Sequence, residues 1–391
     1  RRGSDLMLRI EQLIDPQALE MLTPEWEVLD AELSPRTPFT SPLWNILWWK
    51  HMRSNNLFIC DEFFSHTVRD SDSRLLAVAP MMLTHRPGVG PLRLRELHFF
   101  GADPNMTEIR GLACRPEDQS KVICTLSEHF LANSENWHWL RWTGIPQNAV
   151  ACGAIDSFVQ LRHIVEKPDY YLLLPAAWDE FKSSLSRNIK ESLRKCYNSL
   201  KREGHTFTFR IVDRPEDTTD ALVRFFNLHT ARARLSTTEK HPDVFDAPRA
   251  KDFLTSYARA MAERDCLRIF EIEIGGTVVA TRIGFVFGEE LYLYFSGYDP
   301  NWGKYSIMTT VVAESIKWAI ENRLRVVNLS TGNHVSKTRW GPKEITFRQG
   351  VQVSPKWWGQ LAFATYSKAH SMSPDTHLGL LLNNLRRNRA C

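Results

Sequence analysis

The sequence predicts an α/β (α+β) protein with two domains of one fold, each a mixed, mostly antiparallel sheet flanked by helices. The main observation is an internal repeat: Gly101–Asn105 reads GADPN and Gly297–Asn301 reads GYDPN. Each copy follows a strand-like run and precedes a helix-like stretch and a second strand that ends in Thr-Gly, at 143–144 and 331–332. Four landmarks in the same order indicate a duplicated strand–turn–helix–strand unit.

Length and composition limit the number of domains and the classes of protein that the chain can belong to. The length of 391 residues favours two or three domains, and a net charge of +4 permits an anionic ligand without requiring nucleic acid. The seven cysteines form no CxxC pair, which predicts reduced thiols, no structural zinc or other metal, and a cytoplasmic location. The longest uncharged apolar run, 75–83, is too short to cross a bilayer, so we expect no integral membrane segment.

The first half predicts two helices followed by strands. Residues 16–31 read as one helix, and the proline-bearing turn 37–42 opens a second helix through about residue 51. Trp44, Trp48 and Trp49 share one face of that helix. We interpret this face as packed on the core, with a groove wall or a membrane contact as alternatives. Strands then dominate residues 57–100, and 145–153 looks like a crossover between the halves.

The second half begins with strands at 161–174 and an amphipathic helix over 178–203, which Gly204 is placed to end. Five apolar residues mark the buried stripe of this helix: Phe181, Leu185, Ile189, Leu193 and Leu200. The next predicted elements are a strand (205–212), two helices (222–234 and 253–263) around a polar loop (235–247), three antiparallel strands (267–274, 277–287 and 291–295), a helix (306–322) and a strand (326–329).

The loop before the last predicted helix has the properties of a phosphate site. A helix N-terminus carries unpaired N–H groups and a partial positive charge. Gly303 allows close approach of a ligand, Lys304 adds charge, and Ser306 can cap the helix or bond a ligand oxygen. The loop therefore predicts a pyrophosphate cradle, with an ordinary capped helix start as the alternative.

The first copy of the repeat differs at this position. Residues 106–110 read MTEIR where 302–306 read WGKYS, and the distance from Asp to Thr is 40 residues instead of 32. Because Glu108 stands where an anion would bind, we expect a phosphorylated cofactor only in the second copy.

Three segments resemble a known family: 185–194, 292–302 and 328–340. Together they are similar to the BioF2-like (CelD-type) GNAT acetyltransferase family, which is related to the tandem-GNAT Fem-type ligases. The resemblance implies a tandem GNAT fold, and we expect a degenerate domain (1–155), an acyltransferase domain (156–355) and a tail (356–391). It also implies acyl transfer from acyl-CoA, either acetyl-CoA or a longer acyl-CoA, to an amine. The sequence departs from the family at Ile307-Met308, where Pro-Gly is common, and at Ser336, where Tyr is common.

In this fold the donor lies where two neighbouring strands part, which implies the site residues. We expect proton handling or polarisation from Tyr294, Ser330 and Lys337, although the tyrosine could be a simple sheet aromatic. The expected donor-binding residues are Trp302, Gly303, Lys304, Tyr305 and Ser306. The expected acceptor-binding residues are His229, Arg232, Arg234 and His334, and a solvated charged surface is the alternative for them.

The sequence thus predicts an acyl-CoA-dependent N-acyltransferase acting on a small-molecule or saccharide amine, such as an amino sugar or a cell-envelope or polysaccharide precursor. One alternative is a Fem-type aminoacyl-tRNA-dependent ligase, since residues 187–202 contain six basic residues and one acidic residue. Another is a non-catalytic GNAT-fold binding module. The basic tail 378–389 allows a peripheral membrane contact or a homo-oligomer, or is a fraying terminal helix.

Overall fold

The computed structural model describes residues 8–147, 153, 155–156, 160–235 and 241–371. These described residues form two compact units, one from within 1–167 and 346–371 and the other from within 168–345. The predicted limits were 1–155, 156–355 and 356–391. The boundaries between the two units lie instead after residues 167 and 345, and after residue 345 the chain returns to the first unit. The predicted tail 378–389 lies outside the described residues.

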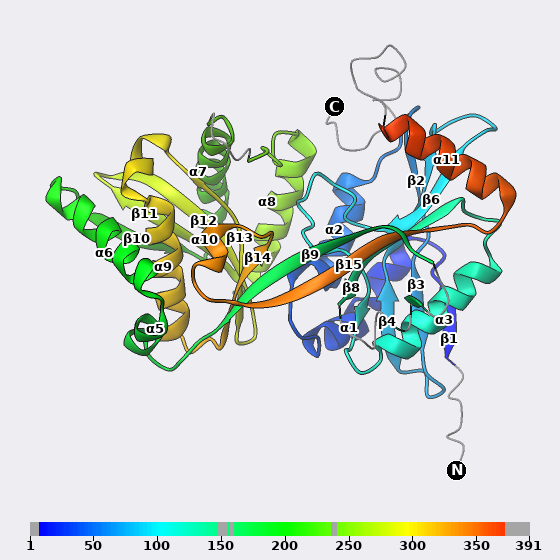
Figure 1. The fold of residues 1–391 in the computed structure, drawn as a ribbon, viewed down its shortest axis with the longest axis horizontal. Coiled ribbons are helices and arrows are strands. Elements are labelled where there is room, and N and C mark those ends of the chain that lie inside the picture. Colours follow the sequence, from blue (N-terminus) through cyan, green and yellow to red (C-terminus); the bar gives the residue numbers. More distant parts are fainter. Residues whose placement is uncertain (1–7, 148–152, 154, 157–159, 236–240, 372–391) are drawn as a thin grey trace. The chain divides into compact units, whose positions relative to one another are not determined.

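The first unit contains strands from two sheets (Figure 1). One sheet has the order β1 (Arg9–Gln12), β3 (His66–Arg69), β4 (Leu75–Ala79) and β7 (Ala113–Cys114). The other runs from β15 (Lys343–Val353) through β8 (Trp139–Pro146), β6 (Leu94–Phe99) and β5 (Met81–Arg86) to β2 (Cys60–Phe63). The helices are α1 (Pro16–Ala31), η1 (Pro38–Thr40), α2 (Pro42–Met52), α3 (Gln119–Ala132) and α11 (Trp357–Ser371).

The second unit is one mixed sheet between two pairs of helices. Its strand order is β10 (Phe207–Val212), β11 (Leu267–Ile274), β12 (Thr277–Phe287), β13 (Glu290–Tyr298), β14 (Val326–Thr331) and β9 (Arg162–Leu173). The helical segments are α5 (Trp178–Ser184), α6 (Arg187–Arg202), α7 (Pro215–Ala233), α8 (Pro248–Glu263), η2 (Pro300–Tyr305), α9 (Ile307–Glu321) and α10 (Val335–Thr338). Leu291 and Leu293 of β13 pack with α6 and α9, whereas the ring of Tyr294 meets Phe245 before α8. Alternate residues of the strand therefore face different helix layers.

The structure confirms the duplicated unit. In the first copy β6 leads through a loop, which contains the two-residue strand β7, to α3 and then to β8, which pairs with β6 in parallel. In the second copy β13 leads through η2 to α9 and then to β14, which again pairs in parallel. Each first strand also pairs antiparallel with the strand before it, β5 or β12. The two units thus contain the same strand–loop–helix–strand arrangement.

The aromatic face of α2 packs on the core, which is the interpretation that we favoured from the sequence. Trp44, Trp48 and Trp49 are all buried. The indole N–H of Trp48 donates to Asp103 Oδ2 at 2.9 Å, and that of Trp44 donates to Thr107 Oγ1 at 3.1 Å. The loop of the first copy is therefore bonded to the unit's own tryptophans, and burial raises the pKa of the Asp103 carboxyl.

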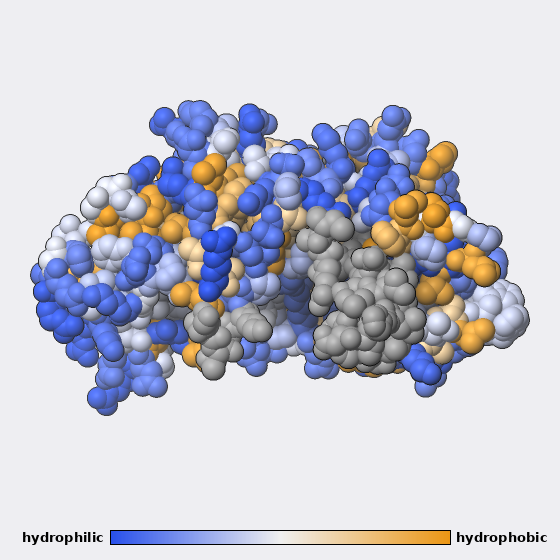
Figure 2. Space-filling view, turned by 90° about the horizontal axis from the view of Figure 1, so that it is seen from above, coloured by the Kyte–Doolittle hydropathy of each residue, from blue (hydrophilic) through white to orange (hydrophobic). Residues whose placement is uncertain are grey.

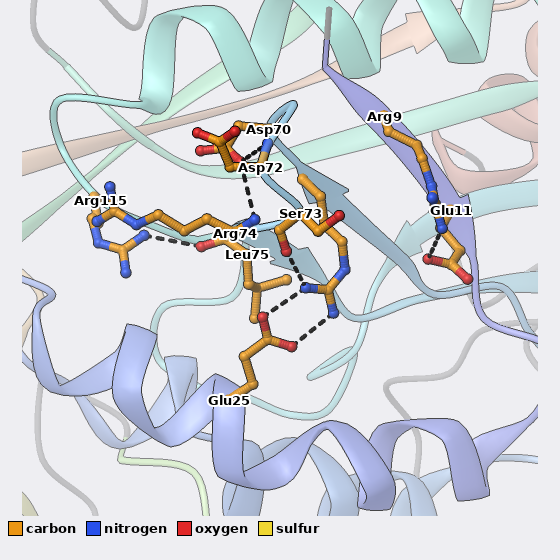
Figure 3. A network of polar contacts seen from close by, with 10 residues as sticks. Arg9, Glu11, Glu25, Asp70, Asp72, Ser73, Arg74, Leu75 and Arg115 are labelled. Atoms are coloured by element: carbon orange, nitrogen blue, oxygen red, sulfur yellow. Dashed lines mark hydrogen bonds and ion pairs between the residues drawn. The ribbon is translucent and has the colours of Figure 1, made fainter.

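Helix α1 is tied to the turn between β3 and β4 (Figure 3). The guanidinium of Arg69 forms two hydrogen bonds with the Glu25 carboxylate, at 2.6 and 2.7 Å, and a third with the Ser73 carbonyl at 2.9 Å. Asp70 Oδ1 accepts the backbone N–H groups of Asp72 and Arg74, both at 3.0 Å. Such a bidentate pair fixes the approach of the helix to the hairpin.

The structure differs from the predicted elements in three ways. The helix expected over 178–203 is two helices, α5 and α6, separated at Leu185-Ser186. The apolar run 75–83, within the stretch 57–100 where we expected strands, is divided into β4 and β5 at Pro80, which has no N–H for a ladder. Elements α10, β15 and α11 were not expected. Within the described part of the chain, no helix is both long enough and apolar enough to cross a membrane.

Candidate functional site

The two central parallel strands of the second unit part from each other. The ladder between β13 and β14 runs from Glu290 and Val326 to Tyr292 and Asn328 and ends there. Beyond it, β13 continues to Tyr298 paired with β12, and β14 continues to Thr331 paired with β9. The C-terminal ends of the two strands are therefore not paired with each other, and we call this break in the ladder the opening.

The β14 side of the opening is built on a strained serine. Ser330 is buried with φ at +70°, a left-handed conformation that costs about 1 kcal/mol outside glycine. Its backbone N–H donates to Asn328 Oδ1 at 2.6 Å. The Asn328 amide in turn donates to Asp169 Oδ2 at 2.7 Å, and Asp169 is fully buried. The asparagine thus connects a buried carboxylate to the backbone that positions Ser330.

The side chain of Lys337, on α10, contacts this serine. Its ammonium donates to Ser330 Oγ at 2.9 Å and also to the Thr331 carbonyl. His334 is the N-cap of α10, and its Nδ1 lies 3.1 Å from the Ser336 N–H and 2.7 Å from the Ser336 hydroxyl. The structure therefore brings together two of the three expected catalytic residues, Ser330 and Lys337, beside the short helix that His334 begins.

The β13 side of the opening is held by α7. Arg232 Nη1 donates to Ser296 Oγ at 2.8 Å, and His229 Nδ1 lies 3.0 Å from the Ser296 carbonyl, so it must carry the proton. A Cβ on Gly297 would lie 2.4 Å from the His229 backbone nitrogen, so the glycine is what allows the helix to lie this close. Burial lowers the pKa values of both Arg232 and His229.

A chain of basic side chains extends from this side toward α10. Arg232 Nη2 donates to His241 Nε2 at 3.2 Å. The His241 ring centroid lies 6.1 Å from that of His334. Side chains from α7, the segment after it and α10 therefore gather near the ends of β13 and β14. Arg234, in contrast, is exposed at the C-terminal end of α7.

Two expected site residues sit in aromatic surroundings. The Tyr294 ring is 2% exposed and contacts Phe245, Phe285 and Phe295. The His229 ring packs against Phe225, Phe245 and Phe295. These contacts favour the alternative that Tyr294 is a sheet aromatic, and they give His229 a part in attaching α7 to β13.

The expected phosphate loop forms the short helix η2. Asp299 Oδ1 accepts the Asn301 N–H at 3.0 Å, and the loop ends at Ser306 in a left-handed conformation with φ at +53°. The Ser306 side chain does not cap α9; its carbonyl instead accepts the Thr309 N–H at 2.8 Å. Ile307, where the family commonly has proline, is fully buried in the core. This loop therefore differs from a simple capped helix start.

A carboxylate that we did not predict lies at this loop. Glu203 Oε2 accepts a hydrogen bond from Lys304 Nζ at 3.0 Å and one from the Tyr305 hydroxyl. The bonds from Tyr305 and from Lys304 hold the pKa of Glu203 below its ordinary value. Trp302 packs on His205, with ring centroids 5.0 Å apart. An acidic residue directly after the basic stretch 187–202 was the available signal for this contact.

Gly303 has no role in the packing of the loop. A Cβ at this position would meet the Tyr298 ring at 3.5 Å, an ordinary contact, and the backbone needs no left-handed conformation there. The fold therefore tolerates a larger residue at this position, in contrast to Gly297. A ligand that approaches the backbone closely would explain the glycine.

We searched the described residues for side chains that could bind a metal ion. No group of three or more His, Cys, Asp or Glu side chains within them is arranged to hold a metal ion. Five cysteines lie in the part of the chain that the structure describes, at 60, 114, 124, 196 and 266, and all five are free thiols. The described polar groups at the opening are hydroxyls, an amide, imidazoles and two cationic side chains.

Comparison with known proteins identifies the fold. Residues 187–338 match the family model of an acetyltransferase (GNAT) domain. The crystal structure of FemX matches with a TM-score of 0.54 and 10% identity, covering 86% of this chain and 96% of that one. The second unit therefore contains a GNAT domain. Because the FemX match covers most of the chain and the strand–loop–helix–strand unit is duplicated, the chain has a tandem fold like that of FemX.

Two further solved structures are similar at lower scores. The C-terminal domain of a putative lysylphosphatidylglycerol synthetase from Agrobacterium fabrum has a TM-score of 0.49 and 10% identity, covering 92% of this chain and 98% of that one. A tandem GNAT protein from the clavulanic acid biosynthesis pathway has a TM-score of 0.44 and 12% identity, covering 88% and 98%. No curated protein matches in sequence. At these identities the likeness concerns the fold alone.

Proposed function

We propose that the second unit transfers an acyl group from a thioester, acyl-CoA, to an amine. The observation that supports this most is the opening between β13 and β14 within a GNAT domain. Ser330 and Lys337 border it on one side, and Ser296 with Arg232 borders it on the other. This arrangement supplies charge and hydrogen-bond donors where a thioester would react.

Three features of the chain suit an acyl-CoA donor. The edges of β13 and β14 have parted, so their backbone groups can hydrogen-bond to an extended donor molecule that carries amide groups. The N-terminus of α9 attracts a diphosphate, and Lys304 in η2 adds a positive charge. Gly303 leaves space for close approach to the backbone. Against this, Glu203 neutralises Lys304 and would have to give up that contact when a diphosphate binds.

The reaction joins the amine nitrogen to the carbonyl carbon of the thioester and breaks the carbon–sulfur bond. The electron pair leaves on sulfur, which takes up a proton, while the amine nitrogen loses one. Negative charge develops first on the carbonyl oxygen and then on sulfur. The Lys337 ammonium and the Ser330 hydroxyl, joined at 2.9 Å, are placed to stabilise that charge. A hydroxyl that accepts a bond from an ammonium is also the better proton donor.

The acceptor side is rich in donors. Arg232, His241 and His334 form the chain of basic side chains that begins at Ser296. Such a surface suits an amine that also carries hydroxyl or anionic groups, for example an amino sugar or a cell-envelope or polysaccharide precursor. We place the reaction in the cytoplasm, where acyl-CoA is available.

Thermal unfolding with added acyl-CoA tests the donor, because a ligand that binds the folded state raises its melting temperature. We expect stabilisation by acetyl-CoA or a longer acyl-CoA, and none by the same concentration of free adenine. Thiol release in the presence of an amine panel then tests the transfer. No stabilisation by any acyl-CoA and no thiol release would refute the proposal.

A second candidate is a Fem-type aminoacyl-tRNA-dependent ligase. The observation that favours it is the outer face of α6, where Arg194, Lys195, Lys201 and Arg202 are exposed. tRNA binding that weakens steeply with salt, and is lost in Arg194→Glu with Lys201→Glu, would support this candidate. A third outcome, ligand binding without thiol release or tRNA binding, would indicate a non-catalytic binding module.

A further inference from the structure

Two neighbouring turns of the first unit expose large apolar side chains. The turn at 56–59 lies between α2 and β2, and the turn at 87–93 lies between β5 and β6. Four side chains form what we call the apolar tip: Leu57 (66% exposed), Phe58 (46%), Val89 (51%) and Leu92 (87%). Hydrophobic residues also reach the surface in several patches in the view of Figure 2. Exposed apolar residues in one place mark an interaction site more often than single ones do.

The two turns are bound to each other and are internally fixed. The Gly88 N–H donates to the Leu57 carbonyl at 2.9 Å. Asn56 Oδ1 accepts the N–H groups of Phe58 and Ile59, both at 2.9 Å. A Cβ on Gly88 would lie 2.0 Å from the Asn56 carbonyl oxygen, so only glycine allows the turns to meet this closely. The apolar tip is therefore held outward by a rigid backbone.

The exposed charges in the two turns and directly before them are positive, and the nearest exposed carboxylate, Glu62 on β2, is bonded to His85 at 2.9 Å. Arg53 is exposed just before the first turn, and Arg93 is exposed in the second turn, where its Nε donates to the Gly90 carbonyl at 2.7 Å. No aspartate or glutamate occurs in 53–60 or in 87–95. A partner that covers this surface should therefore be apolar in its interior and negatively charged at its surface.

We propose that the apolar tip inserts into the surface of an anionic lipid bilayer, so that the protein binds a membrane peripherally. Two tight turns present too small an area for a stable protein partner, which needs about 800 Å² on each side. They can enter between lipid headgroups, where apolar burial and the attraction of arginine to anionic lipid act together. This inference does not depend on the proposed acyl transfer.

The experiment is co-sedimentation of the full chain with vesicles. We expect binding to vesicles of phosphatidylcholine and phosphatidylglycerol in equal parts, and at least about tenfold weaker binding to phosphatidylcholine alone. Leu57→Ser combined with Phe58→Ser should lower the bound fraction about tenfold, and so should Leu92→Ser. The matched control is Met21→Ser on α1, which removes a side chain that is 83% exposed outside the two turns. Thermal unfolding should show that each variant folds.

Three results would overturn the proposal. The first is that the wild-type protein fails to bind the anionic vesicles. The second is that the tip variants bind as well as the Met21→Ser control does. The third is a dimer, seen by light scattering without lipid, that the tip variants abolish; that result would assign the apolar tip to self-association.

Discussion

The Lys337 ammonium donates a hydrogen bond to the Ser330 hydroxyl at 2.9 Å, just beyond the point where β13 and β14 part. Ser330 reaches this position only through a left-handed backbone that Asn328 supports from within the same strand. A strained residue persists when its surroundings over-determine it, and such residues gather at functional sites. The pair is therefore the part of the opening that can be tested most directly.

Replacing Lys337 with methionine should slow acyl transfer while the protein remains folded. Methionine keeps much of the length of the side chain and removes the ammonium that meets Ser330 Oγ. We expect kcat to fall about 10²- to 10³-fold with a small change in KM for the donor, since the lost interaction acts on developing charge. The control is Lys317→Met on α9, which removes an exposed ammonium. Equal activity of the two variants would remove Lys337 from the reaction.

Replacing Asn328 with leucine should reduce both stability and activity. The change removes the bond to the Ser330 N–H and one of the donors to the buried Asp169 carboxylate. We expect a loss of about 3 kcal/mol in urea unfolding, because a buried charged acceptor loses its donor. Adding Ser330→Gly should recover part of the stability, since glycine adopts the left-handed conformation unaided, but none of the activity. Full activity in the double variant would show that the hydroxyl is dispensable.

Two glycines of the second repeat should respond differently to alanine. A Cβ at Gly297 collides with the His229 backbone at 2.4 Å, whereas one at Gly303 meets Tyr298 at 3.5 Å. We expect Gly297→Ala to cost about 2 kcal/mol and to move α7 with Arg232, lowering affinity for the acceptor. Gly303→Ala should unfold like the wild type and weaken donor binding alone. Isothermal titration with acyl-CoA and urea unfolding distinguish these outcomes, and normal donor binding by Gly303→Ala would argue against a phosphate site there.

How far the sequence could predict this molecule depends on how local each signal was. The repeat and the apolar stripe of 178–203 are local patterns, and all five stripe residues are buried. The break in that helix was not predicted, because the stripe continues across it. There the hydroxyls of Ser183 and Ser184 bond to the backbone carbonyls of Glu180 and Phe181, both at 2.8 Å. Such bonds compete with the helix.

The same distinction applies to the candidate site. Lys337 and Ser330 are seven residues apart, and the turn that joins them was visible in the sequence. Arg232 and Ser296 are 64 residues apart, and Lys304 and Glu203 are 101 apart. These contacts depend on how α7 packs on β13 and α6 on η2. Pattern alone could nominate Arg232 but could not identify its partner. For Glu203 it offered only an acidic residue directly after the basic stretch 187–202, without its partner.

Replacing Glu203 with glutamine should strengthen donor binding. The Glu203 carboxylate accepts a hydrogen bond from Lys304, and the bonds that Lys304 makes with Tyr305 and Glu203 raise the pKa of that lysine. A neutral amide keeps the shape and releases the cation for a diphosphate. We expect KM for acyl-CoA to fall about two- to fivefold, an effect that salt reduces. The control is Glu191→Gln on α6, whose partner is Arg187. An unchanged or higher KM would place the diphosphate away from Lys304.

The first unit should lose stability in mild acid through His66. This residue is fully buried, and its ring lies between those of Phe64, His129 and Phe130. Burial, together with the charge of His129, lowers its pKa to about 4. In the unfolded chain it titrates near its ordinary value of 6.5. As the pH falls from 6.5 toward 4, the unfolded state therefore binds a proton that the folded state does not, and the stability present above 6.5 is lost.

Replacing His66 with leucine should remove most of this dependence on pH. We expect the wild type to lose about 2 kcal/mol of unfolding free energy between about pH 7 and about pH 5, and the variant to lose much less. The control is His163→Leu in β9, because His163 is exposed. The measurement is urea unfolding at both pH values, followed by fluorescence of the buried tryptophans. If His66→Leu keeps the full wild-type slope, other groups cause the acid sensitivity; His138, whose burial lowers its pKa to about 4, would then be the next residue to replace.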